Sequence, residues 1–188
     1  MERLALRGKL FVITGLPGSG KTTRAKELAV EHAALRLTPD DWMIPLFEQH
    51  DEEGKRDVLE GRFIWLATTA LELGTSVVLD FGVWARDERS ALKHLASKIG
   101  AECELVYTPI GPAEQMRRVA TRFATAPETT FVITEADLAQ WRHEFQEPDQ
   151  QELRSPEPGP LPEGFTSWEA WTARRWPTSI DPPSGSAG

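Results

Sequence analysis

The stretch that decides how this sequence folds is Gly15-Leu16-Pro17-Gly18-Ser19-Gly20-Lys21-Thr22. Before it, residues 9–14 form a short apolar run with β-branched residues, which is typical of a strand buried on both faces. After it, from Lys21 to about residue 32, apolar residues recur at helical spacing. A strand followed by a glycine-rich loop and a helix can direct successive backbone N–H groups toward an anion. The positive end of the helix dipole then lies behind these groups.

The spacing of this stretch is that of the phosphate-binding P-loop, G-x-x-x-x-G-K-[ST]. Lys21 supplies a mobile positive charge for β- and γ-phosphate oxygens, and the Thr22 hydroxyl can ligate Mg²⁺. The alternative, a glycine turn that only joins a strand to a helix, is disfavoured by this context. ATP is favoured over GTP because no guanine-type Asn/Thr-Lys-x-Asp string follows. The predicted nucleotide-binding residues are Gly15, Pro17, Gly18, Ser19, Gly20, Lys21, Thr22 and Thr23.

The rest of the sequence alternates between strand-like and helix-like patterns. Further strands are predicted over residues 35–38, 76–81 and 102–107. Helices are predicted over residues 40–47, 56–73, 86–99, 112–123 and 134–145. Strands that alternate with helices of this length indicate right-handed βαβ units. We therefore expect an α/β fold of three layers with a mainly parallel sheet.

A change in composition divides the chain near Pro148. Eight of the fourteen prolines lie from that residue onward, so we expect a regular domain over residues 1–147 and an extension over 148–188. Trp168, Trp171 and Trp176 need an apolar surface to cover them, and part of the extension should pack on the core. The last residues, from 182, are expected to be disordered.

Overall composition excludes several classes of protein. The 188 residues carry a formal charge of -8, which disfavours a general nucleic-acid coat and a long polyanionic partner. The single cysteine, Cys103, excludes an intramolecular disulfide and a multi-cysteine metal site, and it favours a reducing compartment such as the cytoplasm. No apolar run approaches the length of a membrane span or of a signal peptide core. The four histidines are scattered, without metal-ligand spacing.

Asp40 follows the second predicted strand, whose carboxyl end should open on the same crevice as the P-loop. A carboxylate placed there can accept the proton of a hydroxyl that attacks the γ-phosphoryl group. The alternative is that Asp40 caps the helix that follows Pro39. Its neighbour Asp41 is a weaker candidate for the same role.

Asp80 ends the apolar run Val77-Val78-Leu79, which is the pattern of an aspartate that holds Mg²⁺ directly or through water. Burying a carboxylate there costs several kcal/mol unless a cation or donors meet it. The alternatives are a contact with the acceptor and a structural hydrogen bond to the neighbouring loop. Phe81, Val83 and Trp84 could form an apolar wall of the acceptor pocket or belong to the core.

Arg118 and Arg122 lie four residues apart on one face of the predicted helix 112–123. Like charges at this spacing repel each other and favour an anion between them. We expect these side chains over the phosphates, where they would stabilise charge during transfer. The alternative is a solvated basic face that pairs with carboxylates of this acidic protein.

Four segments together carry a family resemblance: residues 15–23 (GLPGSGKTT), 39–42 (PDDW), 79–84 (LDFGVW) and 117–122 (RRVATR). With them the sequence resembles the small P-loop kinases related to the polynucleotide kinase 5′-kinase domain, chloramphenicol phosphotransferase and zeta toxins. The resemblance covers about residues 9–147. It implies that Asp40 is the general base, that Arg118 and Arg122 belong to a lid, and that the parallel sheet has five strands.

The leading interpretation is an ATP- and Mg²⁺-dependent phosphotransferase that acts on a hydroxyl of a small molecule, such as an antibiotic, a nucleoside or a sugar nucleotide. The catalytic residues would be Asp40, Lys21, Arg118 and Arg122, with Thr22 and Asp80 on Mg²⁺. Alternatives are a polynucleotide 5′-hydroxyl kinase, a toxin-like kinase of cell-wall sugar precursors, and a nucleotide-dependent regulatory ATPase that binds a partner through the extension. The identity of the acceptor and the oligomeric state are not encoded in any of these patterns.

Overall fold

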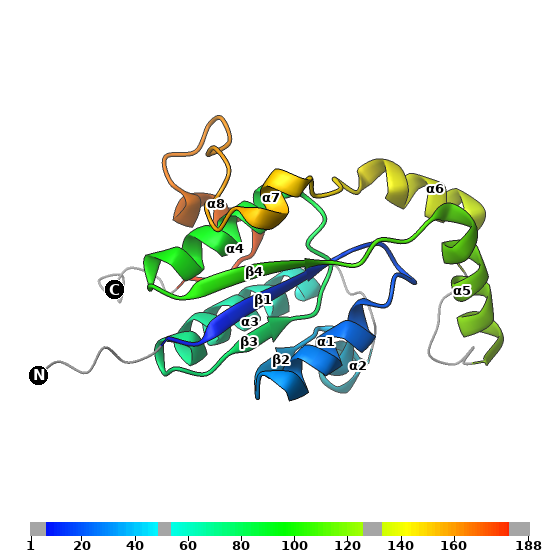
Figure 1. Ribbon diagram of the computed structural model, residues 1–188, viewed down its shortest axis with the longest axis horizontal. Helices are drawn as coiled ribbons and strands as arrows, with labels where there is room; N and C mark the ends of the chain where they lie inside the picture. Colours follow the sequence, from blue (N-terminus) through cyan, green and yellow to red (C-terminus); the bar gives the residue numbers. More distant parts are fainter. Residues whose placement is uncertain (1–6, 49–53, 126–132, 181–188) are drawn as a thin grey trace, which may run out of the picture.

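A parallel sheet of four strands forms the centre of the molecule (Figure 1). The computed structural model describes residues 7–48, 54–125 and 133–180. The strand order is β2-β3-β1-β4. In the register of the sheet, Phe11 of β1 lies between Val78 of β3 and Glu104 of β4. The strands are β1 (Lys9–Thr14), β2 (Leu35–Leu37), β3 (Val77–Leu79) and β4 (Glu102–Tyr107).

Helices connect and cover the strands, and their positions follow the predicted pattern within a few residues. The two short helices α7 and α8 lie in the proline-rich region, where no helix was predicted. The helices are α1 (Lys21–Glu31), α2 (Asp40–Phe47), α3 (Lys55–Glu72), α4 (Arg86–Lys98), α5 (Pro112–Thr125), α6 (Glu135–Glu144), α7 (Gln150–Arg154) and α8 (Trp168–Arg175). The predicted α/β fold with a parallel sheet is confirmed.

The two faces of the sheet are covered by different helices, as the period of two along a strand requires. Leu10 and Val12 of β1 point to the face that packs on α3, α4 and α8. Phe11 and Ile13 point to the opposite face, where Ala25 and Leu28 of α1 cover them. Both faces are therefore apolar, which explains why residues 9–14 are apolar without alternation.

The sheet has one strand fewer, among the residues that the structure describes, than the five that the family resemblance implies. All four apolar runs that the sequence predicts as strands are strands in the structure. The outer edge of β4 does not carry a fifth strand within the described ranges, because α7 and the residues after it pack along that edge. The fifth strand was expected from the resemblance alone, and no described residues form it.

The described part of the extension packs on the same core as the sheet. Trp176 is completely buried and Trp168 nearly so, and both belong to the apolar cluster that contains Leu10 and Leu79. Trp171 is partly buried, with its ring 5.8 Å from those of both other tryptophans. Residues 182–188, predicted to be disordered, lie outside the described residues.

Helices α5 and α6 stand beyond the carboxyl ends of the strands (Figure 1). The N-terminus of α6 has a capping box, in which the Asp137 amide donates to Thr134 Oγ1 (3.1 Å) and the Thr134 amide donates to Asp137 Oδ2 (2.8 Å). No helix of the described segments has the length and apolar character needed to cross a membrane. The carboxyl ends of the strands, with α1, α2 and α5 around them, are the place where a parallel α/β sheet binds its ligands.

Candidate active site

The glycine-rich loop joins β1 to α1 and takes backbone conformations that only glycine adopts easily. Gly18 and Gly20 have positive φ angles of 82° and 94°. Gly20 is also the residue that caps α1, so no cap side chain bonds to the first amides of the helix. A Cβ on Gly15 would lie 2.5 Å from Thr108 Oγ1 and 2.7 Å from Ser19 Oγ, which forces glycine there. The loop therefore presents the backbone amides that an anion would need.

The loop is also held from the α5 side. Gln115 is completely buried and donates from Nε2 to the Pro17 carbonyl (2.9 Å). Its Oε1 accepts a hydrogen bond from Arg142 of α6. Arg118 Nη1 donates to the Gly18 carbonyl (3.3 Å). Helices α5 and α6 thus fix the outer side of the loop through carbonyl groups, which leaves its amides available.

Lys21 is folded back onto the loop. Its Nζ donates to the carbonyl oxygens of Gly15 (2.9 Å) and Leu16 (3.0 Å). Burial lowers the pKa of Lys21 to about 8, while the carboxylates of Asp80 and Asp40 oppose this change. An anionic phosphate would therefore restore the full positive charge of this side chain.

Asp80 directly follows β3, and its side chain is almost completely buried. Arg36 of β2 donates to Asp80 Oδ2 from both Nε (2.9 Å) and Nη2 (2.7 Å). Burial raises the pKa of the Asp80 carboxyl, whereas Arg36 and Lys21 counteract this effect. Both hydrogen bonds from Arg36 end on one oxygen, so the arginine satisfies the charge in part and leaves Oδ1 for a further ligand. Asp80 thus makes a structural ion pair and also reaches the crevice.

Asp40 is the first residue of α2 but does not occupy its cap position. The amides of Trp42 and Met43 donate to the carbonyl of Pro39 (2.9 and 2.8 Å), so Pro39 stands where a cap residue would. The Asp40 side chain is 67% exposed, and its Oδ1 accepts from Arg56 Nη1 of α3 (3.1 Å). Asp41 instead pairs with Arg36 (2.9 Å), away from the crevice.

The α5 arginines separate into two groups. Arg118 donates to Glu114 (2.6 Å) as well as to the loop, and Arg122 lies one turn further along on the same side. Arg117 makes two bonds to Glu114 (2.8 and 2.7 Å) and stays 68% exposed. The ion pairs with Arg117 and Arg118 lower the pKa of Glu114 to about 2. The predicted pair Arg118 and Arg122 faces the crevice, whereas Arg117 does not.

One hollow of about 500 Å³ brings most of the predicted site residues together. It also includes Arg56 and Trp84. The predicted residues that line it are Pro17, Gly18, Gly20, Lys21, Thr22, Thr23, Asp40, Asp80, Arg118 and Arg122. Two carboxylates and four cationic side chains therefore line a single space that is large enough for a phosphate chain and part of an acceptor.

A second hollow of about 450 Å³ adjoins the first on the other side of Arg118. Ser19, Gly20 and Thr23 form its floor, and Tyr107 and Pro109, at and after the end of β4, form its wall. Ser19 Oγ is bonded to Thr108 Oγ1 (2.7 Å), which ties this wall to the loop. Of the predicted nucleotide-binding residues, Ser19 lines only this hollow, and Gly15 packs behind the loop on Thr108.

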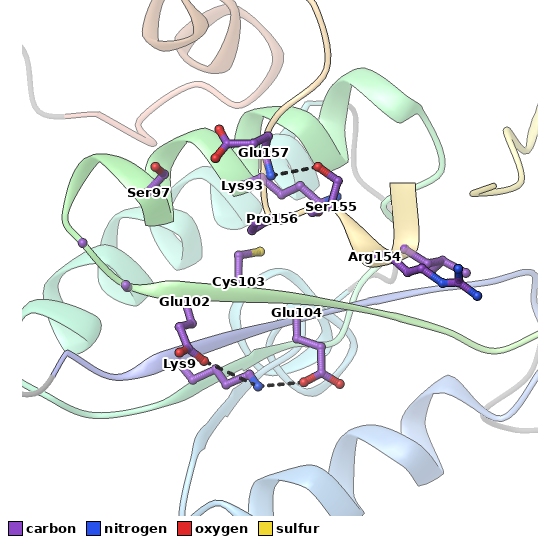
Figure 2. Close-up of a pocket in the computed structure, with 13 residues that line it drawn as sticks. Lys9, Lys93, Ser97, Glu102, Cys103, Glu104, Arg154, Ser155, Pro156 and Glu157 are labelled. Carbon is purple, nitrogen blue, oxygen red and sulfur yellow. Dashed lines mark hydrogen bonds and ion pairs between the residues drawn. The ribbon is translucent and has the colours of Figure 1, made fainter. Parts of the chain in front are cut away.

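Another hollow, of about 560 Å³, lies at the start of β4, away from the P-loop (Figure 2). None of the predicted site residues lines it. Lys9 bridges Glu102 and Glu104 at its lower side, and Cys103 points from β4 toward Ser155 and Pro156 (Figure 2). Burial raises the pKa of the Cys103 thiol to about 12, which disfavours the reactive thiolate form.

Sequence reasoning missed Arg36 and Arg56, the two arginines that pair with the acidic site residues. The signal for Arg36 was weak but present, because a charged residue stands between Leu35 and Leu37 in a short strand. Arg56 and Glu60 lie four residues apart, which from sequence alone indicates an ordinary exposed pair on a helix. No group of three or more histidine, cysteine or acidic residues among the described residues could hold a metal ion by itself.

This arrangement of loop, carboxylates and arginines on a parallel sheet defines a small P-loop protein of the kinase-like class. The chain belongs to the family described as AAA domain, whose model matches residues 10–148. None of the curated proteins matches the sequence.

Solved structures support the same fold. The chain is similar to a gluconokinase from Sinorhizobium meliloti 1021 (16% identity, TM-score 0.55, 79% of this chain and 80% of that one). It is similar to Kti12 from Chaetomium thermophilum, solved with ADP-AlF3 (21% identity, TM-score 0.56, 74% and 81%). It also matches a chain of the Pnkp1/Rnl/Hen1 RNA repair complex (18% identity, TM-score 0.63), covering 76% of this chain but only 45% of that one. At these identities the likeness concerns the fold.

Proposed function

We propose that this protein is an ATP- and Mg²⁺-dependent phosphotransferase that moves the γ-phosphoryl group to a hydroxyl of a small molecule. The observation that carries the proposal is the single hollow that holds the P-loop lysine and the Asp40 carboxylate together. A P-loop by itself serves hydrolysis as well as transfer. A carboxylate across the same space from the phosphate site supports transfer, because an acceptor hydroxyl needs a group to take its proton.

The residues of the loop fit a nucleotide. The backbone amides after Gly18 and the Lys21 ammonium would bind β- and γ-phosphate oxygens. Lys21 would exchange its bonds to the Gly15 and Leu16 carbonyls for bonds to phosphate. The adjoining hollow beside Tyr107 and Pro109 is the proposed place of the nucleoside, because it meets the phosphate site at Gly20 and Arg118.

The oxygen ligands near the loop fit Mg²⁺. The Thr22 hydroxyl and the Asp80 carboxylate line the same hollow, and Mg²⁺ characteristically binds one or two protein oxygens together with phosphates and water. When bound, the ion would neutralise charge on the β- and γ-phosphates. The lack of a larger acidic cluster among the described residues agrees with such a site.

Asp40 would act as the general base, and Arg118 and Arg122 would stabilise the transferring phosphoryl group. Only Asp40 Oδ1 is bonded to Arg56, so the second oxygen can accept the proton of the acceptor. Arg118 lies between the two hollows, at the position between nucleoside and acceptor. Trp84 gives the acceptor side an apolar wall. The net charge of -8 agrees with a small acceptor better than with a polynucleotide.

The test is a screen with ATP and Mg²⁺, read by mass spectrometry for the gain of one phosphate. The compounds are antibiotics, nucleosides and sugar nucleotides, with an oligonucleotide bearing a 5′-hydroxyl as a separate arm. We expect a small molecule to be phosphorylated. ADP release without a phosphorylated product would instead support a regulatory ATPase, and phosphorylation of the oligonucleotide alone would support a polynucleotide kinase.

The roles of the two neighbouring aspartates can be separated in the same assay. Asp40→Asn is expected to keep nucleotide affinity while transfer falls by roughly 10²- to 10⁴-fold. Asp41→Asn is the matched control, because this carboxylate pairs with Arg36 outside the hollow, and it should stay close to wild-type activity. Equal activity of Asp40→Asn and wild type would sink the base assignment.

A further inference from the structure

The C-terminal segment of residues 168–180 packs on α4 and also makes polar contacts with the first two turns of α3. Thr178 Oγ1 donates to the Val58 carbonyl (3.0 Å). Arg175 donates to Asp57 of α3 and to Glu88 of α4, both at 2.7 Å. These contacts join residues that lie more than eighty positions apart in the chain. The segment is therefore bound to α3 by specific polar bonds in addition to its buried tryptophans.

Gly61 lets the segment approach this closely. A Cβ at this position would lie 2.0 Å from the Pro177 carbonyl oxygen and 3.1 Å from the Ser179 amide nitrogen. Glycine inside a helix costs about 1 kcal/mol relative to alanine. That cost is offset here because the turn after α8 sits directly on the helix backbone.

Glu60 connects the segment to the candidate active site. Its side chain is 5% exposed. Oε2 accepts from the indole Nε1 of Trp176 (3.0 Å), and Oε1 accepts from Nε of Arg56 (3.2 Å). The other end of the Arg56 guanidinium donates to Asp40 (3.1 Å) at the edge of the hollow. Trp176, Glu60, Arg56 and Asp40 thus form one continuous chain of hydrogen bonds.

This series of hydrogen bonds sets how the Arg56 guanidinium approaches the Asp40 carboxylate. An unrestrained arginine tends to pair with a carboxylate through two parallel bonds, which would occupy both oxygens. Here the guanidinium is shared between two carboxylates, because Nε donates to Glu60 while Nη1 donates to Asp40 Oδ1, and the bond to Asp40 is therefore a single one. The indole of Trp176 in turn fixes the Glu60 carboxylate from the opposite side.

From this geometry we infer that Glu60 and Trp176 are positioning residues for Arg56, through which the C-terminal segment keeps one oxygen of Asp40 available on the acceptor side. The inference rests on the proposed function for its catalytic consequence. The positions of Arg56 and Asp40 themselves can be tested without any acceptor.

Two variants interrupt this series of hydrogen bonds in different ways. Trp176→Phe removes the indole donor and keeps most of the buried ring, and Glu60→Gln leaves one acceptor oxygen in place of the two that bind Arg56 and the indole. Trp171→Phe is the matched control, because its ring belongs to the same aromatic cluster, whereas the bond to Glu60 comes from Trp176. Urea denaturation of each full-length variant shows that it is folded.

The first measurement is NMR of the Arg56 Nε–Hε group and of the Asp40 carboxyl carbon in the free protein. We expect both signals to shift in Trp176→Phe and in Glu60→Gln and to stay in place in Trp171→Phe. Unchanged signals in both test variants would overturn the inference. This result does not depend on the reaction that the protein catalyses.

The second measurement uses the phosphorylated compound found in the screen. In both test variants we expect kcat for transfer to fall by about 10- to 100-fold with KM for ATP unchanged, since a small misplacement of a reacting group has this size of effect. An equal loss in the control Trp171→Phe, or a parallel change in KM for ATP, would show a general structural role and overturn the inference. If the wild type phosphorylates nothing, the proposed function fails while the NMR result still decides the inference.

Discussion

Replacing Gly61 by alanine tests whether the C-terminal segment is an integral part of the fold. On an exposed helix the change would stabilise the protein by about 1 kcal/mol. Here the new Cβ would lie 2.0 Å from the Pro177 carbonyl oxygen, whereas ordinary contact begins at 3.4 Å. The turn after α8 would have to move away by the difference, which also pulls Trp176 from Glu60.

The magnitude follows from two costs and one gain. Loss of the bond to the buried Glu60 carboxylate costs about 1–3 kcal/mol. Forced displacement in a packed region costs about 1–3 kcal/mol more. After subtraction of the helix-propensity gain of about 1 kcal/mol, we expect Gly61→Ala to lower the free energy of unfolding by about 1–5 kcal/mol.

Urea denaturation followed by circular dichroism measures this change as a lower midpoint with a similar m-value. Gly111→Ala is the matched control, since a Cβ there meets no atom within 4 Å, and it should change the free energy of unfolding by no more than about 0.5 kcal/mol. If Gly61→Ala is as stable as the wild type or more so, the segment does not pack on α3 as described.

Three further predictions concern charged groups. Lys21, with a pKa of about 8, should take up about half a proton when nucleotide binds at pH 8 and almost none at pH 6. Calorimetry in buffers of different ionisation enthalpy measures this proton uptake. Equal uptake by Lys21→Met would contradict the prediction. Burial raises the pKa of Glu60 from 4.5 to about 7, so the folded protein keeps a proton that the unfolded chain has released, and stability falls as pH rises through that window. Glu60→Gln should therefore gain up to about 3 kcal/mol relative to wild type between pH 4.5 and 7.5; parallel curves from denaturation at several pH values would refute this. Arg36→Met should cost about 3 kcal/mol of unfolding free energy at pH 7 by leaving the buried Asp80 unpaired, and adding Asp80→Asn should recover most of it in the same denaturation assay.

Local patterns were sufficient for the strands and for helices α1 to α6, but not for α7 and α8 in the proline-rich region. The apolar runs of β1 and β3 are buried on both faces, so their sequences carry a strong signal that does not depend on distant residues. The P-loop spacing placed Lys21 and Thr22, and the rule that carboxyl ends of parallel strands meet at one edge placed Asp40 and Asp80 beside them. The structure brings all four to the same hollow.

Contacts between distant elements were not predictable in this way. The partners of the two aspartates, Arg36 and Arg56, depend on how β2 and α3 are placed against β3 and α2. The orientation of a tryptophan depends equally on tertiary packing. Trp84 lines the hollow at the P-loop, whereas Trp65 lines a separate hollow on the other side of α3, under Arg62.

The position of α8 shows that the end of the family match and the end of the apolar core are different boundaries in this chain. The family match ends at residue 148, yet the apolar core that contains Leu10 and Leu79 also contains Trp168 and Trp176. The stretch that the family model matches is therefore shorter than the stretch that builds the apolar core. A chain cut at the homology boundary would expose the apolar faces of α3 and α4 that α8 covers, and large exposed apolar patches favour aggregation. In this protein, tryptophans from beyond the family match therefore form part of the hydrophobic core.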